Sequence, residues 1–303
     1  MAFYLPILIK PKNRKIMITT VNYHLLKACN FKCKFCYATF EDICTKGLSK
    51  NEQFQLIEKL AQAKLFKKIN FAGGEPTLVP HIKELIQFSK SLGYETSLVT
   101  NGSRINGKWI EEVAPYLDIL ALSIDSIDYE TNLSSGRNQN GKIVSTENFL
   151  EIANFCHIYG ISLKINTVVF KENQNEYLAD FINQMKPFRW KILQVTRVEG
   201  QNDKQFDEVK VSKEEFYAFC EKNKQGLSPE IKLIPEANDT IQGSYLMVDM
   251  LGRFYDSSKG CHSYSQPILN VGVQNALKEI YVSHEKFIQR EGNYSVIDAK
   301  IKV

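Results

Sequence analysis

Three cysteines in one short loop are the residues of this sequence best suited to hold a metal centre. Cys29, Cys33 and Cys36 follow the spacing C-x3-C-x2-C. Thiolates are the usual ligands of iron–sulfur clusters. Three of them can hold three corners of a [4Fe–4S] cube and leave the fourth iron open for a small ligand, which distinguishes a reactive cluster from an electron-transfer cluster. The spacing therefore predicts a reactive [4Fe–4S] cluster.

Two alternatives to a cluster stay open for these cysteines. A structural zinc site would use the same three thiolates, with His24 or Cys44 as its fourth ligand. In the second alternative, the three thiols are unrelated and share no function. The spacing favours the cluster over both.

Long basic side chains recur at alternate positions of three expected strands. They are Lys68, Lys164, Arg189 and Lys191. Alternate residues of a barrel strand face inward, and the residues between these cations are apolar, so we expect the cations to face a central lumen. Buried cations without partners are costly, and the lumen is therefore expected to bind an anion such as a polyphosphate. Any one of these lysines alone is more simply a snorkelling side chain.

Alternating strands and helices must position these residues. We expect strands at 16–22, 68–72, 96–100, 119–124, 161–169 and 188–195. Helices are expected after the capping box at Ser49, at 81–92, after the cap Asn106, at 145–159 and at 177–185. Six units of this kind predict an α/β fold with a parallel sheet covered by helices, in the form of a partial (βα)6 TIM-like barrel.

The pattern changes after about residue 199. A second capping box at Ser212 begins another expected helix, and short strands are expected at 245–250 and 252–255. We therefore divide the chain into an N-terminal segment (1–15), a partial barrel (16–199) and a C-terminal α+β extension (200–303) that closes the substrate site.

Composition limits which cellular compartment and which kinds of partner are to be expected for the protein. The chain has 303 residues and seven cysteines, and it carries no convincing secretory signal or membrane-spanning apolar run. Clustered cysteines without such a signal favour a cytoplasmic protein whose thiols bind metal. The formal charge of +4 is weak support for a nucleic-acid or membrane partner, so we expect neither, and we expect a soluble monomer.

A second motif gives the cysteine loop a family. Phe71-Ala-Gly73-Gly74-Glu75-Pro76 follows the second expected strand, and its glycines let the backbone approach a ligand closely. Together the two motifs resemble the radical S-adenosylmethionine (SAM) superfamily. Further segments, in the same order along the chain, resemble the viperin family: Val21–His24, Asn101–Ser103, Ser123–Ser126, Gly136-Arg137, Lys164–Asn166, Arg189–Lys191, Glu199-Gly200, Ser244–Leu246, Arg253-Phe254 and Ile268–Val273.

The resemblance implies a radical dehydration of a ribonucleoside triphosphate. In this family S-adenosylmethionine bound to the open iron gives a 5′-deoxyadenosyl radical, which abstracts the ribose 4′ hydrogen. Loss of the 3′-hydroxyl, with one electron and one proton, gives a 3′-deoxy-3′,4′-didehydro nucleotide that terminates viral RNA chains. The implied partners are CTP, UTP or GTP as substrate and an electron donor such as flavodoxin or ferredoxin.

The resemblance also implies roles for single residues. Tyr245 matches the proton donor to the leaving hydroxyl, although by itself it would be taken for an ordinary buried aromatic residue. The implied S-adenosylmethionine site comprises Tyr37, Gly73, Gly74, Glu75, Ser123 and Arg137. The implied substrate site comprises Asn22 and Asn166 near the ribose and Lys68, Lys164, Arg189 and Lys191 at the triphosphate.

Some features depart from the animal enzymes of that family. The amphipathic N-terminal helix and the terminal tryptophan are absent from this sequence, and residues 195–198 replace a more apolar stretch, which leaves the base open. A radical enzyme that modifies a peptide or RNA remains an alternative, although Cys220 and Cys261 stand alone where peptide-maturing relatives carry further cysteine clusters. A zinc-dependent binding module is the alternative from another class.

Overall fold

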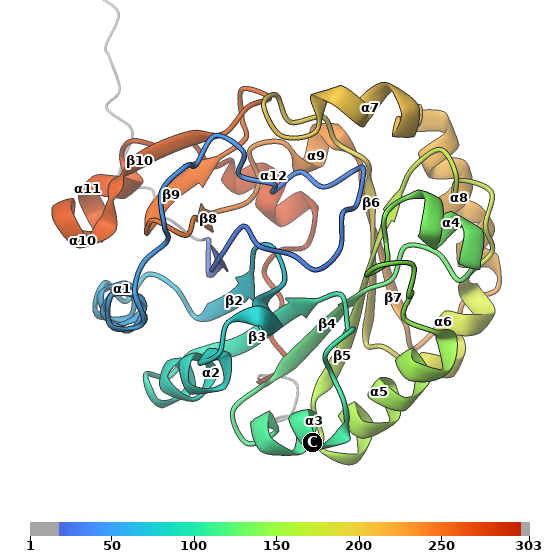
Figure 1. Ribbon diagram of the computed structural model, residues 1–303, viewed down its shortest axis with the longest axis horizontal. Helices are drawn as coiled ribbons and strands as arrows, with labels where there is room; N and C mark the ends of the chain where they lie inside the picture. Colours follow the sequence, from blue (N-terminus) through green and yellow to red (C-terminus); the bar gives the residue numbers. More distant parts are fainter. Residues whose placement is uncertain (1–17, 298–303) are drawn as a thin grey trace, which may run out of the picture.

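A ten-stranded, mostly parallel sheet organises the part of the chain that the computed structural model describes, residues 18–297 (Figure 1). The expected segment 1–15, the first two residues of the strand expected at 16–22 and the last six residues of the chain lie outside the described residues. No described helix is both long enough and apolar enough to cross a bilayer.

Six parallel strands form the centre of the sheet in the order in which they occur along the chain. They are β1 (Thr20–His24), β2 (Lys68–Ala72), β3 (Glu95–Thr100), β4 (Ile119–Ser123), β5 (Ser162–Val169) and β6 (Arg189–Gln194). The prediction of six consecutive parallel strands is confirmed. The largest difference is at β1, which begins at Thr20, so that residues 18 and 19 lie outside the strand, and which continues to His24, because Tyr23 and His24 still pair with β2.

Helices cover the outer face of this sheet (Figure 1). The covering helices are α1 (Lys50–Gln62), α2 (Ile82–Ser91), α3 (Gly107–Val113), α5 (Thr146–Ile158) and α6 (Ala179–Met185). The capping box predicted at Ser49 is present, since its side chain accepts from the Glu52 amide and the Glu52 carboxylate accepts from the Ser49 amide. Each expected helix forms within two residues of the predicted bounds.

The strands sort their side chains between the helices and the lumen. On β2, Ile69 and Phe71 are fully buried in the hydrophobic core, whereas Lys68 and Asn70 line a central cavity. On β6, Trp190 and Ile192 lie in the core and Arg189 and Lys191 line the cavity. The period-two pattern therefore places the apolar residues and the cations on opposite faces, as the sequence predicts.

The C-terminal part of the chain lengthens the same sheet at both edges. β7 (Lys232–Glu236), which was not predicted from the sequence, pairs in parallel with β6, and β8 (Met247–Val248) pairs in parallel with β1. β9 (Arg253–Asp256) and β10 (Ser263–Pro267) continue beyond β8 as antiparallel strands. The intervening helices are α7 (Asp203–Val209), α8 (Lys213–Gln225), α9 (Asn238–Ile241), α10 (Ile268–Val271), α11 (Val273–Leu277) and α12 (His284–Gln289).

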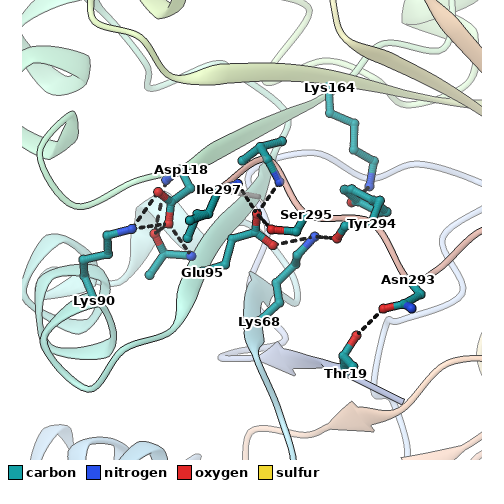
Figure 2. A network of polar contacts seen from close by, with 12 residues as sticks. Thr19, Lys68, Lys90, Glu95, Asp118, Lys164, Asn293, Tyr294, Ser295 and Ile297 are labelled. Atoms are coloured by element: carbon teal, nitrogen blue, oxygen red, sulfur yellow. Dashed lines mark hydrogen bonds and ion pairs between the residues drawn. The ribbon is translucent and has the colours of Figure 1, made fainter. Parts of the chain in front are cut away.

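Residues 290–297, here called the C-terminal strap, follow α12 and lie against the lumen (Figure 2). The Glu95 carboxylate at the start of β3 fixes the strap, because it accepts from the amide of Val296 at 2.6 Å and from the hydroxyl of Ser295 at 3.0 Å. The Nζ of Lys68 donates to the carbonyl of Tyr294 at 2.6 Å. The strap thus brings residues from the end of the chain to the cations of β2 and β5.

Candidate active site

The cysteine loop is held in place by close backbone contacts with two glycines. It begins after β1 and passes over the Gly73-Gly74 turn, where the amide of Gly74 donates to the carbonyl of Leu26 at 2.7 Å. A Cβ atom on Gly74 would lie 1.9 Å from the carbonyl oxygen of Ala28, and one on Gly136 would lie 2.0 Å from that of Lys32. Both positions therefore require glycine for the loop to take this path.

The three thiols of the loop line a cavity of about 580 Å³ at the carboxyl ends of the parallel strands. All three are free, and burial raises the pKa of each of them, that of Cys36 to about 12. A guanidinium nitrogen of Arg137 lies 3.7 Å from Cys33 Sγ, and Asp125 holds Arg137 through an ion pair of 3.0 Å. Metal coordination deprotonates such thiols and releases protons.

The donor set suits a cluster with one open iron. Three thiols from one loop share the cavity, and in an iron–sulfur cube each thiolate binds a different iron. Among the described residues, no group of three or more His, Cys, Asp or Glu side chains is placed so that it could hold a single metal ion. Cys29, Cys33 and Cys36 are thus the residues that would hold a [4Fe–4S] cluster.

The residues expected to contact S-adenosylmethionine line this same cavity. They are Tyr37, Gly73, Gly74, Glu75, Ser123 and Arg137. The Glu75 carboxylate is turned toward the protein, where it accepts from the amides of Thr77 at 3.0 Å and Asn101 at 2.9 Å. Its side chain therefore shapes the turn, and the partly exposed Gly73 and Gly74 are the residues of the turn whose backbone faces the cavity.

A second cavity of about 230 Å³ lies in the lumen of the sheet. The two cavities adjoin each other, and both are lined by His24, Phe35, Tyr37, Ala72, Val99, Ser123, Asn166 and Val168. All seven residues expected for substrate and proton transfer line the second cavity: Asn22, Lys68, Lys164, Asn166, Arg189, Lys191 and Tyr245. A molecule bound in the lumen would therefore face the cofactor cavity directly.

Most lumen cations already have a carboxylate partner from the chain. Lys68 pairs with Glu95 at 2.9 Å, Lys191 with Glu236 at 3.0 Å, and Arg189 with Glu291 at 3.7 Å. Charges removed from water need such partners. These carboxylates lie far from the cations in sequence and were not identified from it.

Lys164 differs from the other lumen cations, since no described carboxylate lies within ion-pair distance of its ammonium group. Its Nζ donates to the hydroxyl of Tyr294 at 3.2 Å. Burial and the neighbouring Arg189 lower the pKa of Lys164 to about 7. The site therefore gains most from an anion at Lys164.

The ring of Tyr294 lies beside Lys68 and Lys164 (Figure 2) and also contacts Arg189. The Nζ of Lys68 is 3.6 Å from its centroid, the guanidinium carbon of Arg189 is 4.4 Å away, and the Nζ of Lys164 is 5.7 Å away. The face of an aromatic ring attracts cations through its quadrupole. The strap thus contributes to the same end of the lumen as the cations, although Tyr294 belongs to no motif that the sequence would reveal.

Amides line the lumen between the cations and the cofactor cavity. The side-chain amide of Asn70 donates to Asn22 Oδ1 at 2.9 Å, and Asn22 in turn donates to the carbonyl of Leu246 at 3.0 Å. The Oδ1 atoms of Asn70 and Asn166 are buried without a hydrogen-bond partner among the described residues. An unsatisfied buried acceptor costs about 1–3 kcal/mol, so these positions favour a ligand that carries hydroxyl groups.

Tyr245 lies between a carboxylate and two cations. Its hydroxyl donates to Glu236 and accepts from Lys191. The guanidinium carbon of Arg290 is 3.7 Å from the centre of its ring. Burial raises the pKa of Tyr245 well above its usual value, so the phenol is protonated at neutral pH. Arg290 is a fifth lumen cation that was not predicted, because it lies in a segment without strand alternation.

Comparison with known proteins places this geometry in a family. The model of the Radical SAM superfamily matches residues 23–185. The chain is 45% identical to an S-adenosylmethionine-dependent nucleotide dehydratase of Lacinutrix mariniflava, over 92% of this chain and 59% of that protein. It is 44% identical to one of Flammeovirga pacifica, over 92% of this chain and 96% of that protein. A fish protein, S-adenosylmethionine-dependent nucleotide dehydratase RSAD2 of Siniperca chuatsi, is 35% identical over 94% of the chain and 81% of its own length.

Solved structures agree with this fold. Native anSMEcpe with bound AdoMet superposes with a TM-score of 0.62 at 14% identity, over 90% of this chain and 82% of that chain. Streptococcus suis SuiB bound to S-adenosylmethionine superposes with a TM-score of 0.61 at 17% identity, over 78% of this chain and 59% of that chain. At these identities the likeness shows a shared fold. The chain spans less than two thirds of the Lacinutrix protein and of SuiB.

Proposed function

Because the chain belongs to the Radical SAM superfamily and, within it, to the S-adenosylmethionine-dependent nucleotide dehydratases, we propose that it dehydrates a ribonucleoside triphosphate to the 3′-deoxy-3′,4′-didehydro nucleotide. The observation that carries this proposal is the adjoining pair of cavities. One presents three thiols suited to a cluster, and the other presents five cations and a protonated phenol.

The cofactor cavity would generate the radical. When bound, a [4Fe–4S] cluster and S-adenosylmethionine supply the 5′-deoxyadenosyl radical that abstracts the ribose 4′ hydrogen. Cys29, Cys33 and Cys36 would hold the cluster. The backbone of the Gly73–Glu75 turn, with Tyr37, Ser123 and Arg137, would orient S-adenosylmethionine.

The lumen would bind the nucleotide by its triphosphate. One end of the lumen is lined by Lys68, Lys164, Arg189 and Lys191. A polyphosphate bound there would favour the protonated form of Lys164 and would accept hydrogen bonds from the planar guanidinium group of Arg189. The ribose would then lie at the amides of Asn22 and Asn166, close to the boundary between the cavities. Binding at a fixed phosphate position aligns the 4′ hydrogen with the radical.

Tyr245 would complete the reaction on the nucleotide. Its protonated hydroxyl can pass a proton to the 3′ oxygen, which leaves as water, while a reductant such as flavodoxin or ferredoxin supplies the further electron. Positioned proton donors contribute typically 10²–10⁴-fold to a rate. The product would act as an antiviral chain terminator, and we propose a cytoplasmic, monomeric enzyme.

The proposal does not specify the nucleobase of the substrate. CTP, UTP and GTP are the candidate substrates. Gln194, Thr196 and Val198 line the lumen beyond the cations. Thr196 and Asn238 are hydrogen-bonded to each other, so the polar groups in this region are largely satisfied within the protein.

An anaerobic assay with each of the four ribonucleoside triphosphates tests the proposal. The reconstituted protein, S-adenosylmethionine and a reductant are incubated with one nucleotide at a time, and both 5′-deoxyadenosine and nucleotide product are measured by mass. We expect a product lighter than its substrate by one water for at least one nucleotide. Cofactor cleavage without any such product from all four would refute the proposed function.

A further inference from the structure

The carboxylate of Glu236 is a fully buried charge that has no role in the steps above. Glu236 is the last residue of β7, and its side chain is inaccessible to solvent. One oxygen accepts from the hydroxyl of Tyr245, and the other lies 3.0 Å from Lys191 Nζ and 3.8 Å from a guanidinium nitrogen of Arg290. An unpaired buried carboxylate would be very costly, so this one is specifically matched to these three neighbours.

The hydrogen bonds at Tyr245 run in one direction. Lys191 donates to the phenol oxygen, and the phenol donates to Glu236. The phenol oxygen therefore already has an ammonium group as its nearest proton source. Glu236 holds both partners of this contact, one through each of its oxygens.

We propose that Glu236 is a positioning residue that holds Tyr245 and Lys191 as a proton-transfer pair, in which Lys191 replaces the proton that Tyr245 gives to the substrate. This inference rests on the proposed function. The O–H bond of Tyr245 breaks and its proton goes to the 3′ oxygen, which departs with the C–O electrons as water. An N–H bond of Lys191 then breaks, its proton passes to the phenolate, and Lys191 regains a proton from solvent after product release. The electron comes from the reductant that the reaction already requires.

The charges around the pair give this arrangement a definite pH dependence. The groups that face Tyr245 are Glu236 from β7, Lys191 from β6, Arg290 after α12 and Tyr37 from the cysteine loop. Burial lowers the pKa of Lys191, Glu236 opposes this effect, and the neighbouring cations Lys164 and Arg290 lower the pKa further. Without the charge of Glu236 the pKa of Lys191 falls further. The proton transfer from Lys191 to Tyr245 needs protonated Lys191. The pH above which product formation declines should therefore be lower without the charge of Glu236.

Substitution of Glu236 tests the pairing. Glu236→Gln keeps the size and an acceptor for Tyr245 but removes the charge, and Glu236→Asp keeps the charge but withdraws it by one methylene. Asp118→Asn is the control, because Asp118 is a largely buried carboxylate that pairs with Lys90 at 2.6 Å and lines neither cavity. Nucleotide product per 5′-deoxyadenosine is measured across a pH series, and nucleotide binding is measured on cluster-free protein.

We expect Glu236→Gln to lower the product yield per cofactor by about tenfold or more and to move the alkaline limb to lower pH. Glu236→Asp should lower the yield less and leave the alkaline limb in place, and Asp118→Asn should change neither the yield nor the limb. A wild-type yield and pH profile in Glu236→Gln would overturn the inference. If that variant does not fold, a wild-type yield in Glu236→Asp overturns it. A wild-type protein that forms no product would instead refute the proposed function.

Discussion

The two adjoining cavities are built in different ways. The cofactor cavity takes its thiols from eight consecutive residues, and within the described chain their one cationic contact is the approach of Arg137 to Cys33. The lumen takes its cations from β2, β5, β6 and the strap, and most of them are paired with carboxylates of the chain. The first site thus offers free ligands to a cofactor. The second holds five cations against three carboxylates of the chain, so a triphosphate would meet an excess of positive charge but would compete with ion pairs that already exist.

Loss of one cluster ligand should abolish the chemistry of the cofactor cavity and leave nucleotide binding in the lumen intact. In Cys33→Ala we expect the iron content and 5′-deoxyadenosine formation to fall to background, because two thiolates from this loop cannot hold the cube. Nucleotide binding to the lumen should persist in titration calorimetry. Cys44→Ala, at an exposed thiol, is the control and should keep its iron. Full iron content in Cys33→Ala would contradict the assignment of the loop.

Loss of the phenol hydroxyl should affect the chemistry of the lumen far more than its occupancy. In Tyr245→Phe we expect the rate of nucleotide product formation to fall about 100-fold, as for other positioned proton donors. Nucleotide affinity should change by less than about fivefold, the effect of one neutral hydrogen bond. Tyr281→Phe, at an exposed tyrosine, serves as control. A wild-type rate in Tyr245→Phe would return Tyr245 to a packing role.

Removal of the unpaired cation should weaken the lumen and spare the cofactor cavity. In Lys164→Ala we expect nucleotide affinity to fall about 10- to 100-fold, the value of a charged hydrogen bond, and Lys191→Ala should act in the same direction. Binding of S-adenosylmethionine to the reconstituted variants should remain. Lys213→Ala, at an exposed ion pair on α8, is the control. Unchanged nucleotide affinity in Lys164→Ala would place the triphosphate elsewhere.

A smaller effect concerns protons. The pKa of Lys164 is about 7 without a nucleotide, because burial, Arg189, Lys68 and Arg290 lower it more than Glu236 raises it. A bound polyanion raises this pKa, so binding takes up a proton at pH values above 7. The contribution of Lys164 to affinity should be full well below pH 7 and should be lost as the pH rises above 7. Calorimetry in buffers of different ionisation enthalpy measures the uptake, which should disappear in Lys164→Met; equal uptake in both proteins would contradict a titrating Lys164.

The same contrast explains what the sequence could predict. The cysteine loop and the Gly73–Glu75 turn are contiguous, and the alternation of cations and apolar residues on β2, β5 and β6 follows from strand geometry, so both could be found without coordinates. The strand at β7 could not, because its alternation is short and it follows a helix outside the repeating units.

The carboxylate partners of the lumen cations could not be predicted from the sequence either. Glu95 meets Lys68, and Glu236 meets Lys191, only because β3 lies beside β2 and β7 beside β6. Arg290 and Tyr294 enter the lumen from a strap that carries no periodic pattern. For Glu75 the family resemblance implied a cofactor contact, whereas the structure turns its carboxylate into the protein. Pairings between distant segments are set by tertiary packing, which a single sequence does not display.

Transfer of hydrogen from nucleotide to cofactor would show whether the two cavities act on each other, on which the proposed function depends. The reconstituted protein would be incubated anaerobically with S-adenosylmethionine and a ribonucleoside triphosphate that carries deuterium at the ribose 4′ carbon. We expect deuterium in the 5′-deoxyadenosine and a nucleotide product that has lost one water. Undeuterated 5′-deoxyadenosine with all four labelled nucleotides, formed while the cofactor is being cleaved, would contradict the transfer.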